Sequence, residues 1–139
     1  MDKCIIDTDI FSEFLRGKNK SVVDRATAYI SEHTQLAVAV MTVVEVTSGY
    51  HRTGRAAHLH QFVAYLANVI VLELTEPIAR LAGEIHGQLA SSGTPIGIAD
   101  ITIAATAIHH ELTLITGNTS HYIRIVERGF PLKLDNWKD

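Results

Sequence analysis

The sequence predicts an α/β fold with three layers, α/β/α, around a central, mainly parallel sheet of four to five strands. Short apolar runs alternate with amphipathic segments of helical length along the chain, which is the pattern of strands joined by helices. The strand candidates are apolar throughout, as expected when helices cover both faces of a sheet. A length of 139 residues suits one domain spanning 1–139.

Five segments have the apolar composition of strands. The first ends in a carboxylate, Asp7, and the last is expected at an edge of the sheet. The expected strands cover residues 3–7, 35–40, 69–74, 112–116 and 132–134.

Helical spacing of apolar residues predicts six helices and one shorter helical piece. Gly17 is expected to end the first helix, and Pro77 falls in the first turn of the fifth. Thr42 and Glu45 have the spacing of a capping box, so we expect the third helix to open there and to fade near Gly49. The remaining helices are expected at 9–16, 21–31, 56–67, 76–90 and 100–110, with the short piece at 122–125.

Composition excludes several classes of protein. Cys4 is the only cysteine, so the chain has neither an internal disulfide nor a cysteine zinc site, and a reducing cytoplasm is the expected location. Acidic residues interrupt the N-terminus before a signal peptide forms, and no apolar run reaches the roughly 20 residues that cross a bilayer. The net charge of −3 means that any nucleic-acid contact is local rather than driven by bulk charge.

Three carboxylates are candidates for a common site. Asp7 and Glu45 follow predicted strands, at the sheet edge where open α/β folds bind ligands. Asp100 opens the most apolar helix, where an unpaired charge is costly. Three like charges that converge at one rim repel each other, and a hard divalent cation removes that repulsion.

Each carboxylate also has a purely structural interpretation. Asp7 or Asp9 is a suitable cap for the helix that follows, and Asp100 has the position of an N-cap. Glu45 fits a capping box by its spacing from Thr42 alone. Acidic residues favour helix N-termini in any case, so only the combination of all three favours a metal site.

Four ordered segments resemble the PIN-domain family over essentially the whole chain, and the resemblance is closest to VapC-type toxins. A tryptophan near the end, Trp137, and the glycine-proline loop before the third acid are part of it. The segments are 4–9 (CIIDTD), 41–46 (MTVVEV), 95–100 (PIGIAD) and 114–119 (LITGNT).

The resemblance implies that Asp7, Glu45 and Asp100 are the metal-binding acids and that Asn118 lines the same pocket. Family members often have a fourth acid at the position of Asn118 or three residues later, where this chain has His121. The implied activity is that of an Mg²⁺- or Mn²⁺-dependent endoribonuclease, the toxin of a VapBC-type pair. It hydrolyses RNA, with tRNA one candidate, and leaves 5′-phosphate and 3′-hydroxyl ends.

The resemblance also implies partners: a cognate VapB-like antitoxin that covers the cleft, and a second copy of the chain in a homodimer. Apolar side chains suited to a partner helix, although such residues more often belong to a core, are Phe11, Phe14, Leu15, Val46 and Tyr50. An acidic protein that cuts a polyanion needs local cations, for which the candidates are Arg16, Lys18, Lys20, Arg52 and Arg55.

Three alternatives stay open. Asp7-Thr8-Asp9 after a strand resembles haloacid-dehalogenase phosphatases, although Phe11 stands where those enzymes have a small residue. A histidine-based ribonuclease would cut in the presence of a chelator and leave cyclic phosphates. A non-catalytic RNA- or protein-binding module on the same scaffold would show no metal effect on RNA.

Overall fold

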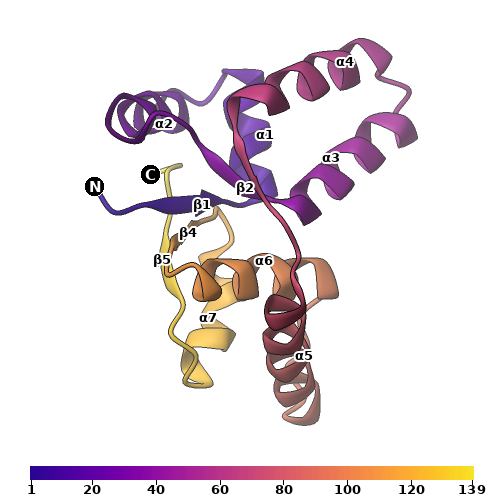
Figure 1. Cartoon of the computed structure of the whole chain (residues 1–139), viewed down its shortest axis with the longest axis vertical. Coiled ribbons are helices and arrows are strands. Elements are labelled where there is room, and N and C mark those ends of the chain that lie inside the picture. The colour runs from indigo at the N-terminus through magenta and orange to yellow at the C-terminus, as the bar shows by residue number, and fades with distance from the viewer.

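The computed structural model describes all residues from 1 to 139. Its strands are β1 (Cys4–Ile6), β2 (Ala37–Ala39), β3 (Ile70–Leu72), β4 (Thr113–Ile115) and β5 (Lys133–Asp135). Hydrogen bonds join β1-β4-β5 and β2-β3, and every pair is parallel. Because β1 lies beside β2, the strands form one layer in the order β3-β2-β1-β4-β5 (Figure 1). The predicted parallel sheet is confirmed.

Seven α-helices connect the strands, and none combines the length and apolar character that crossing a bilayer requires. A single 3₁₀ turn, Leu66–Asn68, follows the fourth helix. The helices are α1 (Thr8–Arg16), α2 (Lys20–His33), α3 (Val40–Arg52), α4 (Ala56–Tyr65), α5 (Glu76–Ser91), α6 (Ile98–His109) and α7 (Thr119–Glu127).

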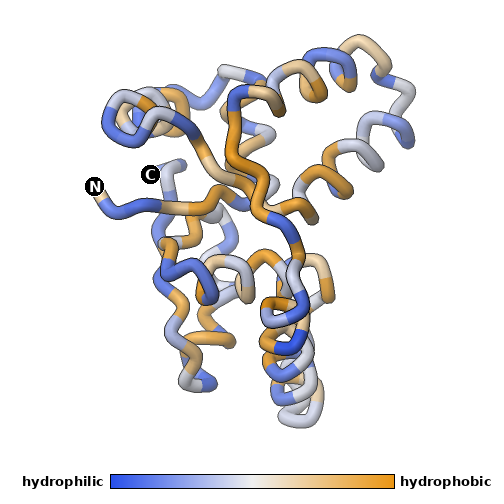
Figure 2. Tube along the Cα trace, viewed as in Figure 1, coloured by the Kyte–Doolittle hydropathy of each residue, from blue (hydrophilic) through white to orange (hydrophobic).

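Two apolar cores, one on each face of the sheet, hold the three layers together. Successive side chains of a strand point to opposite faces. In β1, Ile5 therefore joins the core under α5, α6 and α7, whereas Cys4 and Ile6 join the core under α1 to α4. Figure 2 shows that hydrophobic residues are concentrated in the central strands. Burial on both faces explains why apolar and polar residues do not alternate along these strands.

Two helix starts differ from the sequence-based expectation. The predicted capping box at Thr42 and Glu45 is wrong, because α3 begins at Val40 and its N-cap, Ala39, makes no side-chain cap. The α7 helix starts at Thr119 and is longer than the piece predicted at 122–125. The end of α1 at Gly17 is confirmed, since this residue has a φ of 68° that glycine adopts without strain.

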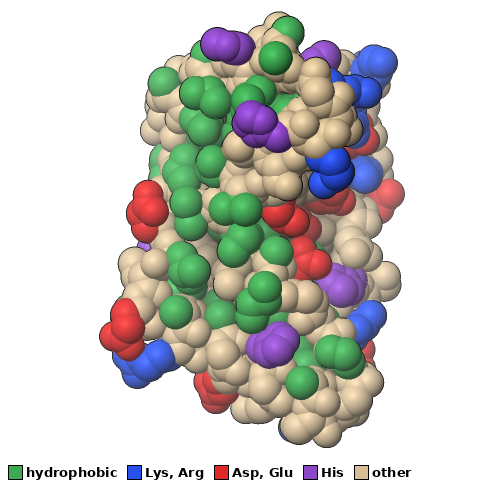
Figure 3. All heavy atoms as spheres, turned by 90° about the vertical axis from the view of Figure 1, so that its right-hand side faces the viewer, with side chains coloured by type: hydrophobic (Ala, Val, Ile, Leu, Met, Phe, Trp, Pro, Cys, Tyr) green, Lys and Arg blue, Asp and Glu red, His purple; other side chains and the backbone are tan.

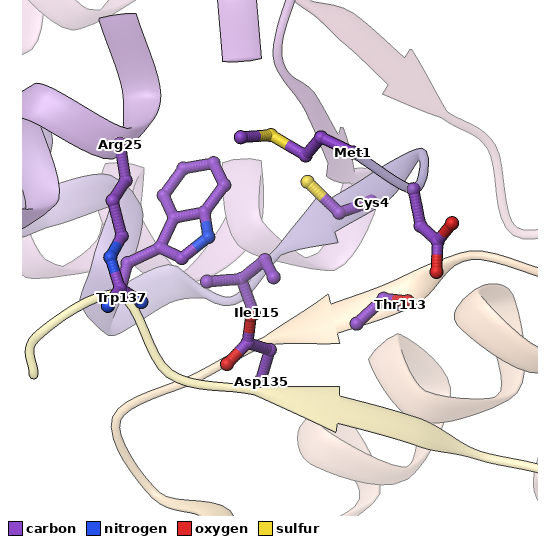
Figure 4. Close-up of a pocket in the computed structure, with 8 residues that line it drawn as sticks. Met1, Cys4, Arg25, Thr113, Ile115, Asp135 and Trp137 are labelled. Carbon is purple, nitrogen blue, oxygen red and sulfur yellow. The ribbon is translucent and has the colours of Figure 1, made fainter. Parts of the chain in front are cut away.

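The C-terminal segment packs against α2 beside a cavity of about 520 Å³ (Figure 4). Trp137 is buried there, and Arg25 donates hydrogen bonds of 2.7 and 2.6 Å to the carbonyl oxygens of Asn136 and Asp139. Burial raises the pKa of the Cys4 thiol in this cavity to about 12, so the thiol stays neutral and unreactive at pH 7. Arg25 and Trp137 thus anchor the end of the chain beside this cavity.

Candidate active site

The carboxyl ends of β1, β2 and β4 open onto a cavity of about 310 Å³. This is the edge of the sheet at which open α/β folds bind ligands. All four residues that the sequence singled out as catalytic contribute to its lining. The lining residues are Asp7, Thr8, Asp9, Glu45, Asp100, Asn118 and Tyr122.

Asp7 is the most deeply buried of the acids, with 6% of its surface exposed. It is the N-cap of α1: the backbone N–H of Thr8 donates to Oδ1 at 2.9 Å, and the Thr116 hydroxyl donates to Oδ2 at 2.8 Å. Burial raises the pKa of Asp7 to about 6, and the charges of Asp9 and Asp100 add to this while the two hydrogen bonds oppose it. Both the capping role and a site role therefore apply to the same side chain.

Glu45 reaches the cavity from the second turn of α3. Its Oε1 accepts a 2.6 Å hydrogen bond from the hydroxyl of Thr8, which lies 3.0 Å from the hydroxyl of Thr42. Because Thr8 has a single hydroxyl proton and gives it to Glu45, the fully buried Thr42 is the donor in the second bond. Two hydroxyls in series thus hold a carboxylate that the capping-box interpretation had assigned to a helix end.

Asp100 lies in the first turn of α6, where the positive end of the helix dipole stabilises a carboxylate. The N-cap is Gly97, so the N-cap interpretation of Asp100 is wrong. Oδ2 of Asp100 lies 3.0 Å from Nε2 of His121, and 34% of the Asp100 side chain is exposed. His121, left open by the sequence, therefore contacts a site acid rather than standing alone in solvent.

Asn118 is the N-cap of α7, but its side chain makes no capping hydrogen bond. Its backbone N–H donates to the Thr116 hydroxyl at 3.0 Å, which is the same hydroxyl that donates to Asp7. The Asn118 side chain lines the cavity. It is thus free to accept from a water or to contact a bound group.

Sequence reasoning gave no site role to Asp9. Its Oδ1 accepts from the N–H of Ile10 at 2.8 Å, and its Oδ2 accepts from the N–H of Gly117 at 3.1 Å and lies 3.7 Å from Nζ of Lys138. Asp9 therefore ties the first turn of α1 to the turn after β4. Lys138 brings a cation to the acidic rim, which its place near the end of the sequence does not indicate.

The positioning hydroxyls of Thr8, Thr42 and Thr116 were also missed. One signal was available, because Thr8 directly follows the predicted acid Asp7 and Thr116 directly follows the apolar strand β4. A threonine at a strand end is common, however, and its hydrogen-bond partner depends on the packing of distant segments. Only the folded arrangement identifies Thr42 as a buried donor.

The donors of this cavity are carboxylate, amide and hydroxyl oxygens, the hard ligands that Mg²⁺ and Mn²⁺ prefer. No group of three His, Cys, Asp or Glu side chains already surrounds one point at metal-binding distance. Glu45 is turned toward Thr8 and Asp100 toward His121, so a cation would draw both side chains inward. The buried hydroxyl of Tyr122 has no hydrogen-bond partner in the protein, which indicates that the cavity accommodates a further polar group. The residues present fit a divalent cation.

The basic residues that the sequence offered as RNA contacts differ in whether they are paired with an acid. Arg16 is paired with Glu13 and Lys20 with Asp24, whereas Arg55 lines a cavity of about 230 Å³ that shares Thr8 and Glu45 with the acidic one. On the face drawn in Figure 3, basic side chains lie next to acidic ones.

The apolar residues that the sequence offered to a partner helix divide in the same way. Phe11 and Val46 are buried in the core under α1 to α4, which is the alternative that the sequence left open for them. Phe14, Leu15 and Tyr50 are only partly buried and pack against that core.

The chain matches the PIN domain family over residues 4–126. It is 31% identical to "Ribonuclease VapC19" of Mycobacterium tuberculosis, over 85% of this chain and 90% of that protein. It is 25% identical to "tRNA(fMet)-specific endonuclease VapC" of Shigella flexneri, over 99% of both chains. In the solved VapBC2 complex of Rickettsia felis bound to promoter DNA, one chain has the same fold, with a TM-score of 0.80, 21% identity and coverage of 96% of this chain and 97% of that one. The chain therefore belongs to the PIN-domain family, in the group of the VapC-type ribonucleases.

Proposed function

We propose that this protein is an Mg²⁺- or Mn²⁺-dependent endoribonuclease and the toxin of a VapBC-type pair. The observation that carries the proposal is the meeting of Asp7, Glu45 and Asp100 in one cavity, although they lie on three separate segments. Family membership alone would fit an inert module on the same scaffold, because a fold does not fix a function. The acid cluster, which would be unfavourable without a cation, favours the enzyme.

Asp7, Glu45 and Asp100 are the proposed metal ligands, and Asn118 is proposed to act beside them on a water or on the RNA. A bound divalent cation supplies Lewis-acid activation of water and charge stabilisation at the phosphate. Thr116 holds Asp7, Thr8 holds Glu45 and His121 holds Asp100, each through one hydrogen bond. Partners of this kind fix the orientation of metal ligands.

Metal-dependent cleavage tests the proposal. Asp7→Asn and Asp100→Asn are expected to reduce cleavage of RNA to background while the circular dichroism spectrum is retained. The matched control is Asp24→Asn, which removes an exposed acid of α2 outside the cavity and should leave cleavage unchanged. Full activity in either site variant would contradict the assignment.

The ends of the products separate the enzymatic alternatives. Hydrolysis at this site should stop in the presence of EDTA and leave 5′-phosphate and 3′-hydroxyl ends. A histidine mechanism, for which His121 beside Asp100 would be the local candidate, predicts chelator-resistant cutting and cyclic phosphates. A phosphatase would form an acyl-phosphate on Asp7, and an inert binding module would hold RNA without cutting it under either condition.

The proposed substrate is structured RNA, with tRNA as the first candidate. One relative named above is a tRNA(fMet)-specific endonuclease by name, and it aligns with this chain over nearly its full length. Sequencing of the 5′-phosphate ends that appear after induction in cells tests this, with the Asp7→Asn variant as the control. Ends confined to messenger or ribosomal RNA would contradict the tRNA assignment.

The proposed partner is a VapB-like antitoxin whose basic side chain enters the acidic cavity. A solved relative is a VapBC2 complex, and the cavity here offers four carboxylates, two of them at least partly exposed. Co-expression with a VapB-like antitoxin should give a stable complex that does not cleave RNA. Normal cleavage by that complex would contradict this role.

A homodimer is proposed as the form in solution. Large hydrophobic side chains are exposed on α3, α4 and the segment before α5, among them Val44, Val63 and Leu74. The face drawn in Figure 3 carries many hydrophobic side chains close to one another. Sedimentation should give twice the mass of the chain, and Val44→Glu should shift it to the monomer. A monomeric wild type would contradict the proposal.

A further inference from the structure

Tyr122 carries the one buried side-chain nitrogen or oxygen that has no hydrogen-bond partner anywhere in the protein. The residue lies on α7 and is 1% exposed, and its side chain lines the acidic cavity. A buried hydroxyl without a partner is destabilising, and it is rare in native structures unless a water, an ion or a ligand completes it. The position of this hydroxyl thus indicates a missing acceptor inside the cavity.

Asp7 and Asp100 lie close enough to the hydroxyl to raise its pKa, but neither accepts a hydrogen bond of ordinary geometry from it. Oδ1 of Asp7 is engaged by the N–H of Thr8 and Oδ2 by the hydroxyl of Thr116, while Oδ2 of Asp100 faces His121. The rings of Tyr122 and His121 pack edge to face with centroids 5.5 Å apart, which fixes the tyrosine ring. The hydroxyl is therefore held near two acids by its ring and not by a hydrogen bond of its own.

The charge around the hydroxyl makes it a donor. Burial raises the pKa of Tyr122, and the negative charges of Asp7 and Asp100 raise it further. The phenol stays protonated at neutral pH and offers its proton to an oxygen. The carboxylates need a cation in the same cavity, whereas the phenol needs an oxygen atom beside that cation.

We propose that Tyr122 is a positioning residue whose hydroxyl donates a hydrogen bond to an oxygen held in the acidic cavity. This oxygen belongs either to a water that enters with the divalent cation or to a phosphate group of the RNA. The inference rests on the proposed function, since both sources presuppose that cation or RNA enters this cavity. Removing the hydroxyl removes the bond and leaves the fold intact.

The experiment compares Tyr122→Phe with Tyr65→Phe. Tyr65 is a suitable control because it lies on α4, packs against Phe11 and Phe14, and does not line the cavity. In the metal-free protein, Tyr122→Phe should unfold at the same temperature as wild type or at a higher one, because it removes an unpartnered group. A clear loss of metal-free stability would show that the hydroxyl has a partner within the protein and would overturn the proposal.

Two binding measurements separate the two sources of the oxygen. If the acceptor is a water, Tyr122→Phe should weaken Mn²⁺ binding in the absence of RNA, by about 10-fold for a group that acts next to a metal ligand. If the acceptor is a phosphate, Mn²⁺ binding is unchanged and the affinity for RNA, measured with Ca²⁺ in place of Mg²⁺, falls instead. Wild-type values for both would overturn the proposal.

A spectroscopic measurement reads the hydrogen bond itself. The Raman doublet of tyrosine reports the state of the phenol, and only four tyrosines contribute to it. Addition of Mn²⁺, or of RNA with Ca²⁺, should change the doublet of wild type and of Tyr65→Phe but not that of Tyr122→Phe. An identical change in Tyr122→Phe would contradict the inference. Failure of the proposed function would appear separately, as metal-independent cleavage by wild type.

Discussion

The hydroxyl of Thr116 donates a 2.8 Å hydrogen bond to Oδ2 of Asp7, joining two residues 109 positions apart in the chain. This bond links the carboxyl ends of β1 and β4, which pair in parallel next to each other. It stabilises the charged form of an acid whose burial favours the neutral form. The hydrogen bond from Thr116 thus offsets part of the free-energy cost of burying the charged Asp7 carboxylate.

Thr116→Val should therefore raise the pKa of Asp7 further, because it removes the donor and keeps the shape. The pH midpoint of Mn²⁺ binding should move upward, since the cation competes with a more tightly held proton. Isothermal titration between pH 5 and 8 measures the midpoint. Thr27→Val, which removes a hydroxyl bonded to the Val23 carbonyl on α2, should leave it unchanged. An unmoved midpoint in Thr116→Val would contradict the role of this bond.

The raised pKa of Asp7 predicts a pH-dependent stability of the metal-free protein. The folded state holds a proton on Asp7 up to about pH 6, whereas the unfolded chain releases it near 3.8. The unfolded state binds fewer protons in this window, so the free energy of unfolding falls as pH rises from 3.8 to 6. Asp7→Asn, which stays neutral, should be more stable than wild type at pH 7 by about 3 kcal/mol.

Urea unfolding in EDTA at pH 3.5 and pH 7 measures this difference. The two proteins should have similar free energies of unfolding at the lower pH and diverge at the higher one. A variant that is less stable than wild type at pH 7 would show that Asp7 does not pay a burial cost. Excess Mg²⁺ should raise the free energy of unfolding of wild type and leave that of the variant unchanged.

Gly117 approaches Asp9 so closely that a side chain does not fit between them. A Cβ at this position would lie 2.6 Å from Oδ2 of Asp9 and 3.0 Å from Cε of Lys138. Gly117→Ala should displace Asp9, break its hydrogen bond to the backbone and destabilise the protein by about 1 to 2 kcal/mol. In the Asp9→Ala background the same change should cost much less. Thermal unfolding of the four proteins tests this coupling, and additive costs would contradict it.

Arg55 is expected to contact the RNA backbone, because its cavity adjoins Glu45 and no carboxylate pairs with it. Arg55→Gln should weaken RNA binding and reduce the slope of log affinity against log salt by about 0.7 to 0.9. Fluorescence anisotropy in Ca²⁺ at several salt concentrations measures both quantities. Arg80→Gln, which loses an arginine paired with Glu76 on α5, is the control. An unchanged slope in Arg55→Gln would remove Arg55 from the interface.

The sheet and its flanking helices were predictable because a strand buried on both faces is an uninterrupted apolar run in the sequence. Strand β1 reads as an apolar run since Ile5 faces one core and its neighbours face the other. The start of α3 was not predictable, because Thr42 and Glu45 have the spacing of a cap while their side chains bond to Thr8 across the site. Tertiary contacts therefore decided whether these residues cap a helix or hold the site.

The acids of the site were predictable, but the groups around them were not. Asp7, Glu45 and Asp100 follow strands or open a helix, so topology alone brings them to one edge. Asp9 and Lys138 meet across nearly the whole chain, and nothing in either local sequence indicates the contact. The free hydroxyl of Tyr122 is equally invisible in the sequence, since tyrosine on an apolar helix face is ordinarily a core residue.

Crystals soaked in Mn²⁺ and measured by anomalous scattering show whether these acids bind a metal ion. A strong anomalous peak is expected within about 2.3 Å of oxygens from Asp7 and Asp100, with Glu45 bound directly or through a water. Glu45 and Asp100 should have turned from Thr8 and His121 toward the ion. A peak elsewhere, or no peak under conditions in which Mn²⁺ supports cleavage, would contradict the proposed metal site.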